Sequence, residues 1–323
     1  MAHLVTSSPT RVLVLGASGF IGSWAVRALI ARGAETHVLC RPSSDLWRLA
    51  GVEPFETHAH PESEWTSVIE RVRPDVVLSL DWAGVAGANR DDAEQFANLQ
   101  RHDDVVKAAA SAGARRFVGV GSQAEYGPKN EVIVETASTE PRTAYGRAKL
   151  AAMAATRARC AELGIEWAWA RVFSTYGALD NGHWLLPLIA DALITGTDID
   201  LTTGEQRWSY LNGADAGAAM AAIALADDAS GIYNVGDPDA PRLRDTIERF
   251  ATHFDSAASL NFGARSMGDD PVVWLQPDVT RLRSLGWERS VALDQGLAEA
   301  ATWFSGGTVP DSFGEQRWLP TRP

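Results

Sequence analysis

The sequence contains 323 residues, 46% of them hydrophobic and 22% charged, and carries a formal net charge of −12 at pH 7. This composition is typical of a soluble globular protein and excludes a disordered or fibrous chain, and the negative charge argues against nonspecific binding to nucleic acid or to an anionic membrane. The two cysteines, Cys40 and Cys160, lie far apart and belong to no C-x-x-C pair. This spacing argues against a disulfide framework or a thiolate zinc site and fits a reducing, cytoplasmic environment.

The N-terminal segment, residues 1–10, lacks a basic region followed by a long apolar run, and no later stretch is apolar over the length that a membrane span needs. We therefore expect residues 1–10 to form a loose tail and the protein to have no membrane partner.

Residues 11–15 form a short apolar run that is typical of a buried parallel strand, and the glycines of residues 16–22 follow it directly. Apolar residues then recur at helical spacing from Ser23 to Arg32, and Gly33 ends the predicted helix. A strand, a glycine turn and a helix in this order form the phosphate-binding loop of dinucleotide-binding folds, where the helix N-terminus attracts negative charge. The predicted cofactor-binding residues of this loop are Gly16, Ser18, Gly19, Phe20, Ile21 and Gly22.

The second predicted strand, residues 36–40, ends on Arg41, and two serines follow Pro42. An NAD-binding chain usually offers an acidic residue to the ribose hydroxyls at this point, whereas a guanidinium beside hydroxyl groups suits a 2′-phosphate. We therefore predict NADPH or NADP as the cofactor, held by Arg41 and Ser44, with NADH as the alternative. The simpler interpretation is an exposed Arg41 that pairs with Asp45.

The next predicted elements are two helix–strand units, at residues 64–72 and 75–80 and at residues 93–112 and 116–121. Ligands bind beyond the carboxyl ends of parallel strands. The segment 81–84 and Ser122 follow the two strands directly, so we expect both to lie beside the nicotinamide. The predicted cofactor contacts at these strand ends are Leu80, Asp81 and Val120.

Tyr145 and Lys149 are four residues apart in a predicted helix, and this spacing places both side chains on one helix face. A cation beside a phenol favours phenolate, so Lys149 is placed to lower the pKa of Tyr145 from its ordinary value of about 10. A tyrosine and a lysine at this spacing are also common on plain surface helices. The predicted position of Ser122 favours the catalytic interpretation, in which Ser122, Tyr145 and Lys149 meet at the cofactor.

Several motifs in the chain occur in a specific order, at residues 16–22, 75–83, 98, 108–109, 121–127, 145–149, 171–177, 206–207, 234–236 and 285–287. Together they resemble the extended short-chain dehydrogenase/reductases, and within them the NAD(P)-dependent nucleotide-sugar epimerase/dehydratase family, over nearly the whole chain. The resemblance implies that Ser122, Tyr145 and Lys149 are catalytic and that Asn98 and Val172 belong to the cofactor site, with Asn98 supporting its geometry. It agrees with the alternation of strands and helices, which predicts an α/β fold with a doubly wound parallel Rossmann sheet and a smaller C-terminal substrate lobe.

Departures from the family pattern narrow the expected reaction. Nucleotide-sugar 4,6-dehydratases resemble one another in an Asp-Glu pair directly after the catalytic Ser or Thr, where this chain has Gln123 and Ala124. Neither side chain exchanges a proton as a carboxyl group does, so we do not expect dehydration. Epimerases of the family retain NAD, which fits poorly with Arg41.

The chain looks most like 4-ketoreductases of the CDP-paratose and abequose synthase type. This similarity implies reduction of the C4 ketone of a CDP- or dTDP-linked 4-keto-6-deoxyhexose by NADPH. Two alternatives stay open: a nucleotide-sugar epimerase with tightly bound NAD(P), and a binding or sensor protein that keeps the fold without chemistry.

The resemblance also implies substrate contacts at Gln123, Ser174 and Arg207. Ser174 stands where many relatives carry an asparagine, and Arg207 matches an arginine that binds the substrate diphosphate, although the residues directly after it depart from the usual sequence. His183 has no partner ligands at zinc spacing, so we interpret it as a loop residue and expect no metal site. Most of the twelve tryptophans should pack in the core.

The predicted domains are a dinucleotide-binding domain of residues 11–178 and 207–237 and a nucleotide-sugar-binding lobe of residues 179–206 and 238–312, with tails at residues 1–10 and 313–323. Related proteins often dimerise through two helices, which here correspond to residues 93–112 and 143–159. The resemblance therefore implies a homodimer that binds a nucleotide sugar and has no nucleic-acid partner.

Overall fold

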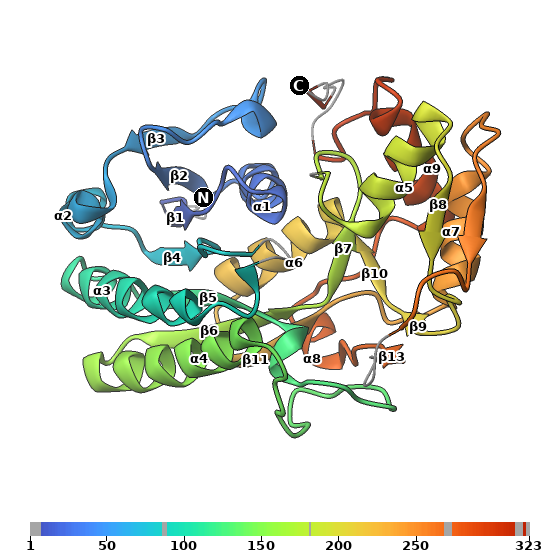
Figure 1. Ribbon diagram of the computed structural model, residues 1–323. Coiled ribbons are helices and arrows are strands. Elements are labelled where there is room, and N and C mark those ends of the chain that lie inside the picture. The colour runs from blue at the N-terminus through green and yellow to red at the C-terminus, as the bar shows by residue number, and fades with distance from the viewer. Residues whose placement is uncertain (1–7, 86–88, 181, 268–272, 314–318, 321–323) are drawn as a thin grey trace, which may run out of the picture.

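A parallel sheet forms the centre of the computed structural model, which describes residues 8–85, 89–180, 182–267, 273–313 and 319–320. The sheet has seven strands in the order β11, β6, β5, β4, β1, β2, β3 (Figure 1). The strands are β1 Arg11–Leu15, β2 Glu35–Cys40, β3 Glu56–Ala59, β4 Val76–Ser79, β5 Arg116–Ser122, β6 Glu166–Val172 and β11 Gly231–Val235. The predicted doubly wound α/β fold is confirmed.

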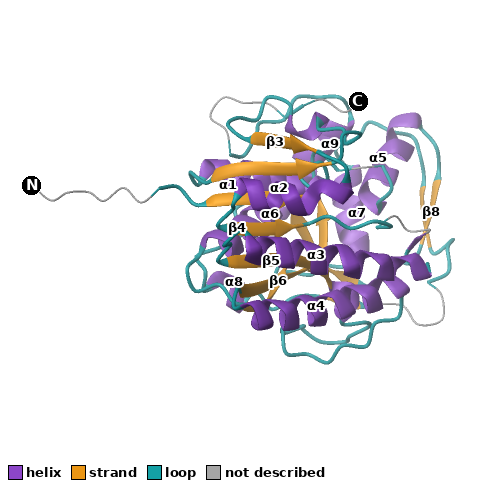
Figure 2. Cartoon of the chain, turned by 90° about the vertical axis from the view of Figure 1, so that its left-hand side faces the viewer, coloured by secondary structure: helices purple, strands orange, loops and turns teal. Residues whose placement is uncertain are grey.

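Helices cover both faces of the sheet because successive strand residues point to opposite sides. In β1, Val12 and Val14 belong to the apolar cluster under α1 and α6, whereas Leu13 and Leu15 belong to the cluster under α2, α3 and α4. Figure 2 shows α2, α3 and α4 along one face. These helices are α1 Phe20–Ala31, α2 Trp65–Val72, α3 Asn98–Ser111, α4 Ala144–Leu163 and α6 Gly213–Leu225.

The strand order reverses at β1, which pairs with β2 on one side and with β4 on the other. In open α/β sheets a crevice forms at this reversal, beyond the carboxyl ends of the strands, and ligands bind there. The glycine loop follows β1 and Asp81 follows β4, so the topology brings both to the crevice.

A second group of elements lies against the carboxyl edge of the sheet, at the right of Figure 1. It contains three short parallel pairs, β7 Ser174–Tyr176 with β10 Tyr210–Asn212, β8 Ile199–Leu201 with β12 Leu260–Phe262, and β9 Arg207–Trp208 with β13 Trp274–Leu275. The helices of this group are α5 Leu185–Thr195, α7 Leu243–Ala251 and α9 Leu293–Phe304, and α8 Thr280–Arg283 packs near β11. An apolar core that includes Ile189, Phe250 and Trp303 joins the three longer helices.

The structure differs from the sequence-based prediction at several elements. Strand β3 was not predicted, because its Glu-Thr-His-Ala sequence is polar and mostly exposed, as edge strands often are. Helix α1 begins at Phe20 rather than Ser23, and the predicted helix at residues 93–112 starts with a 3₁₀ segment, Ala93–Ala97, before α3.

The C-terminal segment packs against the rest of the protein in part. Within the predicted tail 313–323, Leu319 is buried and its backbone N–H donates to the carbonyl of Val309. Among the tryptophans that the structure describes, six are buried, which agrees with packing roles for many of them. Among the described residues, no helix combines the length and apolar composition needed to cross a bilayer.

Candidate active site

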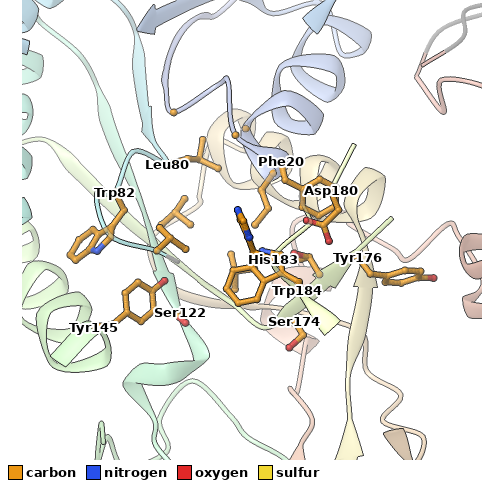
Figure 3. A pocket seen from close by; sticks show the side chains of 18 of the residues that line it. Phe20, Leu80, Trp82, Ser122, Tyr145, Ser174, Tyr176, Asp180, His183 and Trp184 are labelled. Carbon is orange, nitrogen blue, oxygen red and sulfur yellow. The ribbon is translucent and has the colours of Figure 1, made fainter. Parts of the chain in front are cut away.

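A cavity of about 820 Å³ has walls from the carboxyl edge of the sheet and from the second group of elements (Figure 3). Ser122, Tyr145 and Lys149 all line it, as do the predicted substrate residues Gln123 and Ser174. The predicted cofactor-binding residues in its wall are Gly16, Ser18, Gly19, Phe20, Ile21, Gly22, Arg41, Ser44, Leu80, Asp81, Val120 and Val172. Residues that the sequence singled out from separate segments therefore converge on one cavity.

The glycine loop packs so closely against neighbouring backbone that side chains at Gly16 and Gly22 would not fit. Gly16 has a φ of 80°, and a Cβ added there would lie 2.7 Å from the backbone nitrogen of Asp81. A Cβ on Gly22 would lie 2.2 Å from the carbonyl oxygen of Gly16. Helix α1 begins directly after Gly19 with no acidic residue in its first turn, so its N-terminal N–H groups favour an anion. The loop therefore fits the pyrophosphate of a dinucleotide.

Arg41 lies in the cavity wall beside an acid that the sequence analysis did not place there. Its side chain is 61% exposed, and its ion-pair partner is Glu62, at 3.7 Å. Asp45 instead accepts a hydrogen bond from the backbone of Trp47. Glu62 also lies 3.3 Å from Arg101. The end of β2 lacks an acid in sequence, but Glu62, which follows β3, brings one to the same part of the cavity.

Ser122 is the last residue of β5, and Glu125 fixes its backbone. The N–H of Ser122 donates to Oε1 of Glu125 at 2.9 Å. The buried Glu125 carboxylate also accepts hydrogen bonds from Trp169 Nε1 at 3.0 Å and from Arg171 Nε at 2.7 Å. The carboxylate is thus held inside the protein and does not line the cavity.

Tyr145 is buried at the start of α4 and lies beside Ser122 in the cavity (Figure 3). Burial raises the pKa of the phenol, although the Arg90 guanidinium and the Ser122 hydroxyl oppose this rise. Arg90 Cζ lies 4.3 Å from the ring centroid, whereas Lys149 Nζ lies 5.9 Å from it. The expectation that Lys149 lowers the pKa of Tyr145 is therefore wrong for this structure. The phenol stays protonated, and Arg90 is the nearer of these two cations.

Lys149 projects from α4 onto the ring of Trp82. Its Nζ donates to the carbonyl of Val120 at 2.7 Å and lies 3.8 Å from the centroid of the indole. Burial lowers the pKa of Lys149 to about 7, although Glu125 and Asp81 favour the charged form. An ammonium has three donors, so the bond to Val120 leaves N–H groups for a ligand hydroxyl.

Asp81 belongs to a largely buried charged cluster in the cavity wall. Arg101 Nε lies 2.6 Å from Asp81 Oδ2, and the Ser79 hydroxyl donates to Oδ1 at 2.7 Å. Burial alone would raise the pKa of Asp81, but His102, Arg101, Ser79 and Lys149 together lower it. Burial lowers the pKa of His102, and the Asp81 carboxylate opposes this shift. Asp81 is therefore an anion within this cluster.

Asn98 is absent from the cavity wall, so the predicted direct cofactor contact is not found. Its Oδ1 accepts from the backbone N–H of Ala83 at 2.9 Å, and its Nδ2 donates to the carbonyls of Ala83 and Gln95 at 3.2 and 3.0 Å. Gln95 in turn accepts from Trp82 Nε1 at 2.7 Å. Asn98 thus holds the loop after β4, in agreement with a supporting role.

Arg207, a predicted substrate contact, lies outside the cavity wall. It precedes Trp208 in β9, and neighbouring strand residues point to opposite sides. Trp208 faces the cavity and donates to the Ser174 hydroxyl at 2.8 Å, while Arg207 donates to the carbonyl of Ala240 at 3.4 Å. Strand alternation is therefore the physical reason why Arg207, unlike Trp208, does not line the cavity.

Two exposed residues line the cavity on the side of the second group. Arg265 follows β12, and His183 lies in a turn before α5 with its ring directed into the cavity (Figure 3). The sequence analysis correctly assigned His183 to a loop but did not expect it in the cavity wall. Arg265 was not predicted at all.

Some of the missed residues left a signal in the sequence and others left none. Glu125 follows Ser122 by three residues, which is the spacing of a capping box, and the structure contains that box. Arg90, Arg265 and Glu62 reach the cavity through tertiary packing of loops and a 3₁₀ turn, which no local periodicity predicts.

Comparisons with known proteins agree with this geometry. Residues 12–236 match the NAD dependent epimerase/dehydratase family. The chain is 29% identical over 316 residues to dTDP-6-deoxy-L-talose 4-dehydrogenase (NAD(P)(+)) of Kitasatospora kifunensis, covering 94% of this chain and 98% of the relative. It is 26% identical to GDP-L-fucose synthase 1 of Arabidopsis thaliana, covering 93% and 94%.

Among solved structures, UDP-glucose-4-epimerase of Stenotrophomonas maltophila, with bound NAD and formylated UDP-arabinopyranose, is similar with a TM-score of 0.80 at 22% identity. The match covers 91% of this chain and 98% of that structure and concerns the fold. The family match includes the glycine loop, Ser122, Tyr145 and Lys149, and it spans well over half of the sequence. The chain therefore belongs to the NAD-dependent epimerase/dehydratase family.

Proposed function

We propose that the protein reduces the C4 ketone of a nucleotide-linked 4-keto-6-deoxyhexose with NADPH and so produces a 6-deoxyhexose. The observation that carries this proposal is that the hydroxyl-bearing residues Ser122 and Tyr145 share a cavity with the glycine loop, while Gln123 and Ala124 occupy the next two positions after the serine. The nearest following acid, Glu125, is held by three hydrogen bonds away from the cavity. A proton donor without an adjacent free carboxyl group suits ketone reduction better than dehydration.

The names of two relatives support the substrate class. One is named as a 4-dehydrogenase of a dTDP-linked 6-deoxy sugar, and the other is named for a GDP-linked sugar. We extend the nucleotide-sugar class, and reaction at C4, to this cavity. The nucleoside we propose is thymidine or cytidine, the latter from the similarity to CDP-linked 4-ketoreductases.

The chemistry requires one hydride and one proton. The bound nicotinamide would supply the hydride to C4, which reduces the carbonyl carbon by two electrons. Tyr145 would give the proton to the C4 oxygen, and its raised pKa keeps the phenol protonated for that role. Ser122 would donate a hydrogen bond to the same oxygen, and Lys149 would bind the nicotinamide ribose through the N–H groups that Val120 leaves available.

NADPH is the proposed cofactor because Arg41 and Ser44 line the end of the cavity next to the glycine loop, where a 2′-phosphate would lie. Glu62 weakens the preference for NADPH over NADH, since a carboxylate beside Arg41 attracts ribose hydroxyls and repels phosphate. We therefore expect NADH to act as a poorer substitute rather than to fail.

The test is to mix NADPH with dTDP-4-keto-6-deoxyglucose, and separately with its CDP counterpart, and to follow nicotinamide absorbance together with product NMR. We expect one NADPH oxidised per sugar reduced at C4. Tyr145→Phe should lower kcat/KM by about 10² to 10⁴, the usual contribution of a general acid, while NADPH titration by fluorescence stays unchanged. Absence of NADPH oxidation with both sugars would contradict the proposal.

Epimerisation is the second candidate, favoured by one observation: Glu62 brings a carboxylate to the ribose end, as an NAD-retaining protein would need. The same experiment separates the two reactions. An epimerase would change the sugar's configuration without net consumption of cofactor, and NAD(P) would stay with the protein through gel filtration.

A further inference from the structure

Four titratable side chains lie together on one face of the sheet edge, outside the cavity wall. Strands β2 and β3 are parallel, with His37 opposite Glu56 and Leu39 opposite His58. Alternate residues of a strand share a face, so Glu35 and His37 of β2 lie on the same side as Glu56 and His58 of β3. The residues Glu35, His37, Glu56 and His58 do not belong to the cavity wall.

The possible ligand atoms of His37, Glu56 and His58 all lie within 4.8 Å of one another. His37 Nδ1 lies 3.0 Å from His58 Nε2 and 3.6 Å from a Glu56 carboxylate oxygen, and His58 Nε2 lies 3.7 Å from the other oxygen of Glu56. A tetrahedral zinc ion with bonds of about 2.0–2.1 Å holds its ligand atoms about 3.3–3.4 Å apart. The observed separations scatter around that value, so a single ion can contact all three groups after movements of a few tenths of an ångström.

The surroundings of His37 fix which of its ring nitrogens is available. His37 Nε2 lies 3.0 Å from Glu35 Oε1, and Arg11 Nε donates to the same carboxylate oxygen at 2.7 Å. A carboxylate accepts a proton, so Glu35 favours the tautomer with hydrogen on Nε2 and a lone pair on Nδ1. That lone pair faces His58 and Glu56. A carboxylate behind a metal-ligating histidine is the arrangement that orients such ligands in metalloproteins.

We propose that His37, Glu56 and His58 bind one divalent transition-metal ion, best matched by zinc, with Glu35 orienting His37. Two imidazoles and one carboxylate suit zinc, and the Glu56 side chain is 65% exposed, so water can reach the site as a fourth ligand. The ion would join the edge strand β3 to β2 and so stabilise the outer part of the sheet. No metal site was expected from the sequence, since His183 has no partner ligands at zinc spacing. The cluster around His37 was not considered there because, without β3, its residues lie in separate segments.

The experiment uses full-length, untagged protein, because a polyhistidine tag binds the same ions. After EDTA treatment and dialysis, zinc chloride is titrated by calorimetry, and thermal unfolding is measured with and without zinc. We expect one zinc per chain with a micromolar dissociation constant and a higher unfolding temperature with zinc, since a ligand that binds only the folded state stabilises it. Glu35→Gln should weaken binding by about tenfold, as loss of a group behind a metal ligand does.

Two ligand variants and one control locate the ion. Glu56→Gln and His58→Gln should each weaken zinc binding at least tenfold and reduce the zinc-dependent rise in unfolding temperature accordingly. Glu56 is exposed, so its replacement tests the site even where His58→Gln folds poorly. The control is His60→Gln, because His60 pairs with Glu64 at 3.0 Å and is not a proposed ligand. The proposal is overturned when the wild type shows no saturable one-zinc binding, or when Glu56→Gln binds zinc as tightly as the wild type does.

Discussion

The two walls of the cavity are built in different ways. On the sheet side, buried polar groups directly behind the wall have several partners each: the Glu125 carboxylate accepts three hydrogen bonds, and the Asn98 amide takes part in four. On the opposite side, His183, Trp184 and Arg265 are exposed on or beside turns. One wall is a rigid network, and the other is a set of side chains on loops.

This difference in structure corresponds to a difference in function between the two walls, one serving the chemical step and the other substrate recognition. Chemical steps need groups held to about 0.5 Å by their neighbours, which a buried network provides. Recognition of a variable part of a substrate can reside on loops, where changes cost the fold little. We therefore expect substitutions in the sheet-side wall to change stability or rate, and substitutions in the loop-side wall to change substrate affinity.

The largest effect on stability should follow from Glu125→Gln. The change removes the charge that balances the buried Arg171, and breaking a buried ion pair costs about 3–5 kcal/mol. Urea unfolding measures this loss. The matched control is Glu140→Gln, whose side chain is 62% exposed and pairs with Lys129, so about 1 kcal/mol or less is expected there. Equal losses in the two variants would contradict the proposed rigidity of this wall.

The next effect concerns pH and Lys149. Its pKa is lowered to about 7 in the folded protein, while an unfolded lysine titrates near 10.4, so the unfolded chain binds more protons between these values. The contribution of Lys149 to the free energy of unfolding of the wild type therefore falls as the pH falls toward 7. Lys149→Met removes this titration. Between pH 9 and pH 6 the wild type should therefore lose about 2–3 kcal/mol of unfolding free energy relative to the variant, at 1.36 kcal/mol per pKa unit.

Chemical denaturation at the two pH values measures the Lys149 effect. Lys107→Met is the matched control, because Lys107 is 47% exposed and pairs with Asp103 on the surface. The Lys149 variant should lose activity while becoming relatively more stable at low pH. If the difference in unfolding free energy between variant and wild type did not depend on pH, Lys149 would be charged at pH 7 in the folded as well as in the unfolded protein.

A smaller, opposite pair of effects is expected at the ribose end of the cavity. Arg41→Ala should lower kcat/KM with NADPH by about tenfold or more and leave NADH nearly unchanged, because a charge-assisted bond to phosphate is worth about 1.5–3 kcal/mol. Glu62→Gln should instead raise the NADPH to NADH ratio severalfold, since it removes a negative charge beside Arg41. Steady-state kinetics with both cofactors measures these ratios, and an unchanged ratio in both variants would remove the argument for NADP.

The sheet-side wall was largely predictable from the sequence, because its signals are local. The glycines of residues 16–22 follow an apolar strand, and Tyr145 and Lys149 share a helix face by their spacing. The position of Ser122 in the site was predicted from its place at the end of a strand. The electrostatics of the site were not predictable, since burial and the approach of Arg90 from a distant loop decide the pKa of Tyr145.

The sheet edge and the loop-side wall were the parts that sequence patterns missed. Strand β3 is short and polar, so no alternation of apolar residues marks it. Without β3, neither Glu62 nor the cluster around His37 could be brought to its place. Arg207 was assigned by similarity alone, and the register of a two-residue strand then directed it away from the cavity.

The smallest expected effect, a change in KM, comes from comparing Arg265 with Arg207, and it tests the loop-side wall directly. Arg265 lines the cavity and Arg207 does not, although both are exposed arginines of the second group. Arg265→Ala should raise KM for the sugar nucleotide about tenfold, equivalent to 1.4 kcal/mol, with kcat nearly unchanged, because it would remove a contact made equally in ground and transition states. Arg207→Ala should change KM less than twofold. The reverse result would mean that β9 turns over when substrate binds, and that the loop-side wall is rebuilt around the ligand.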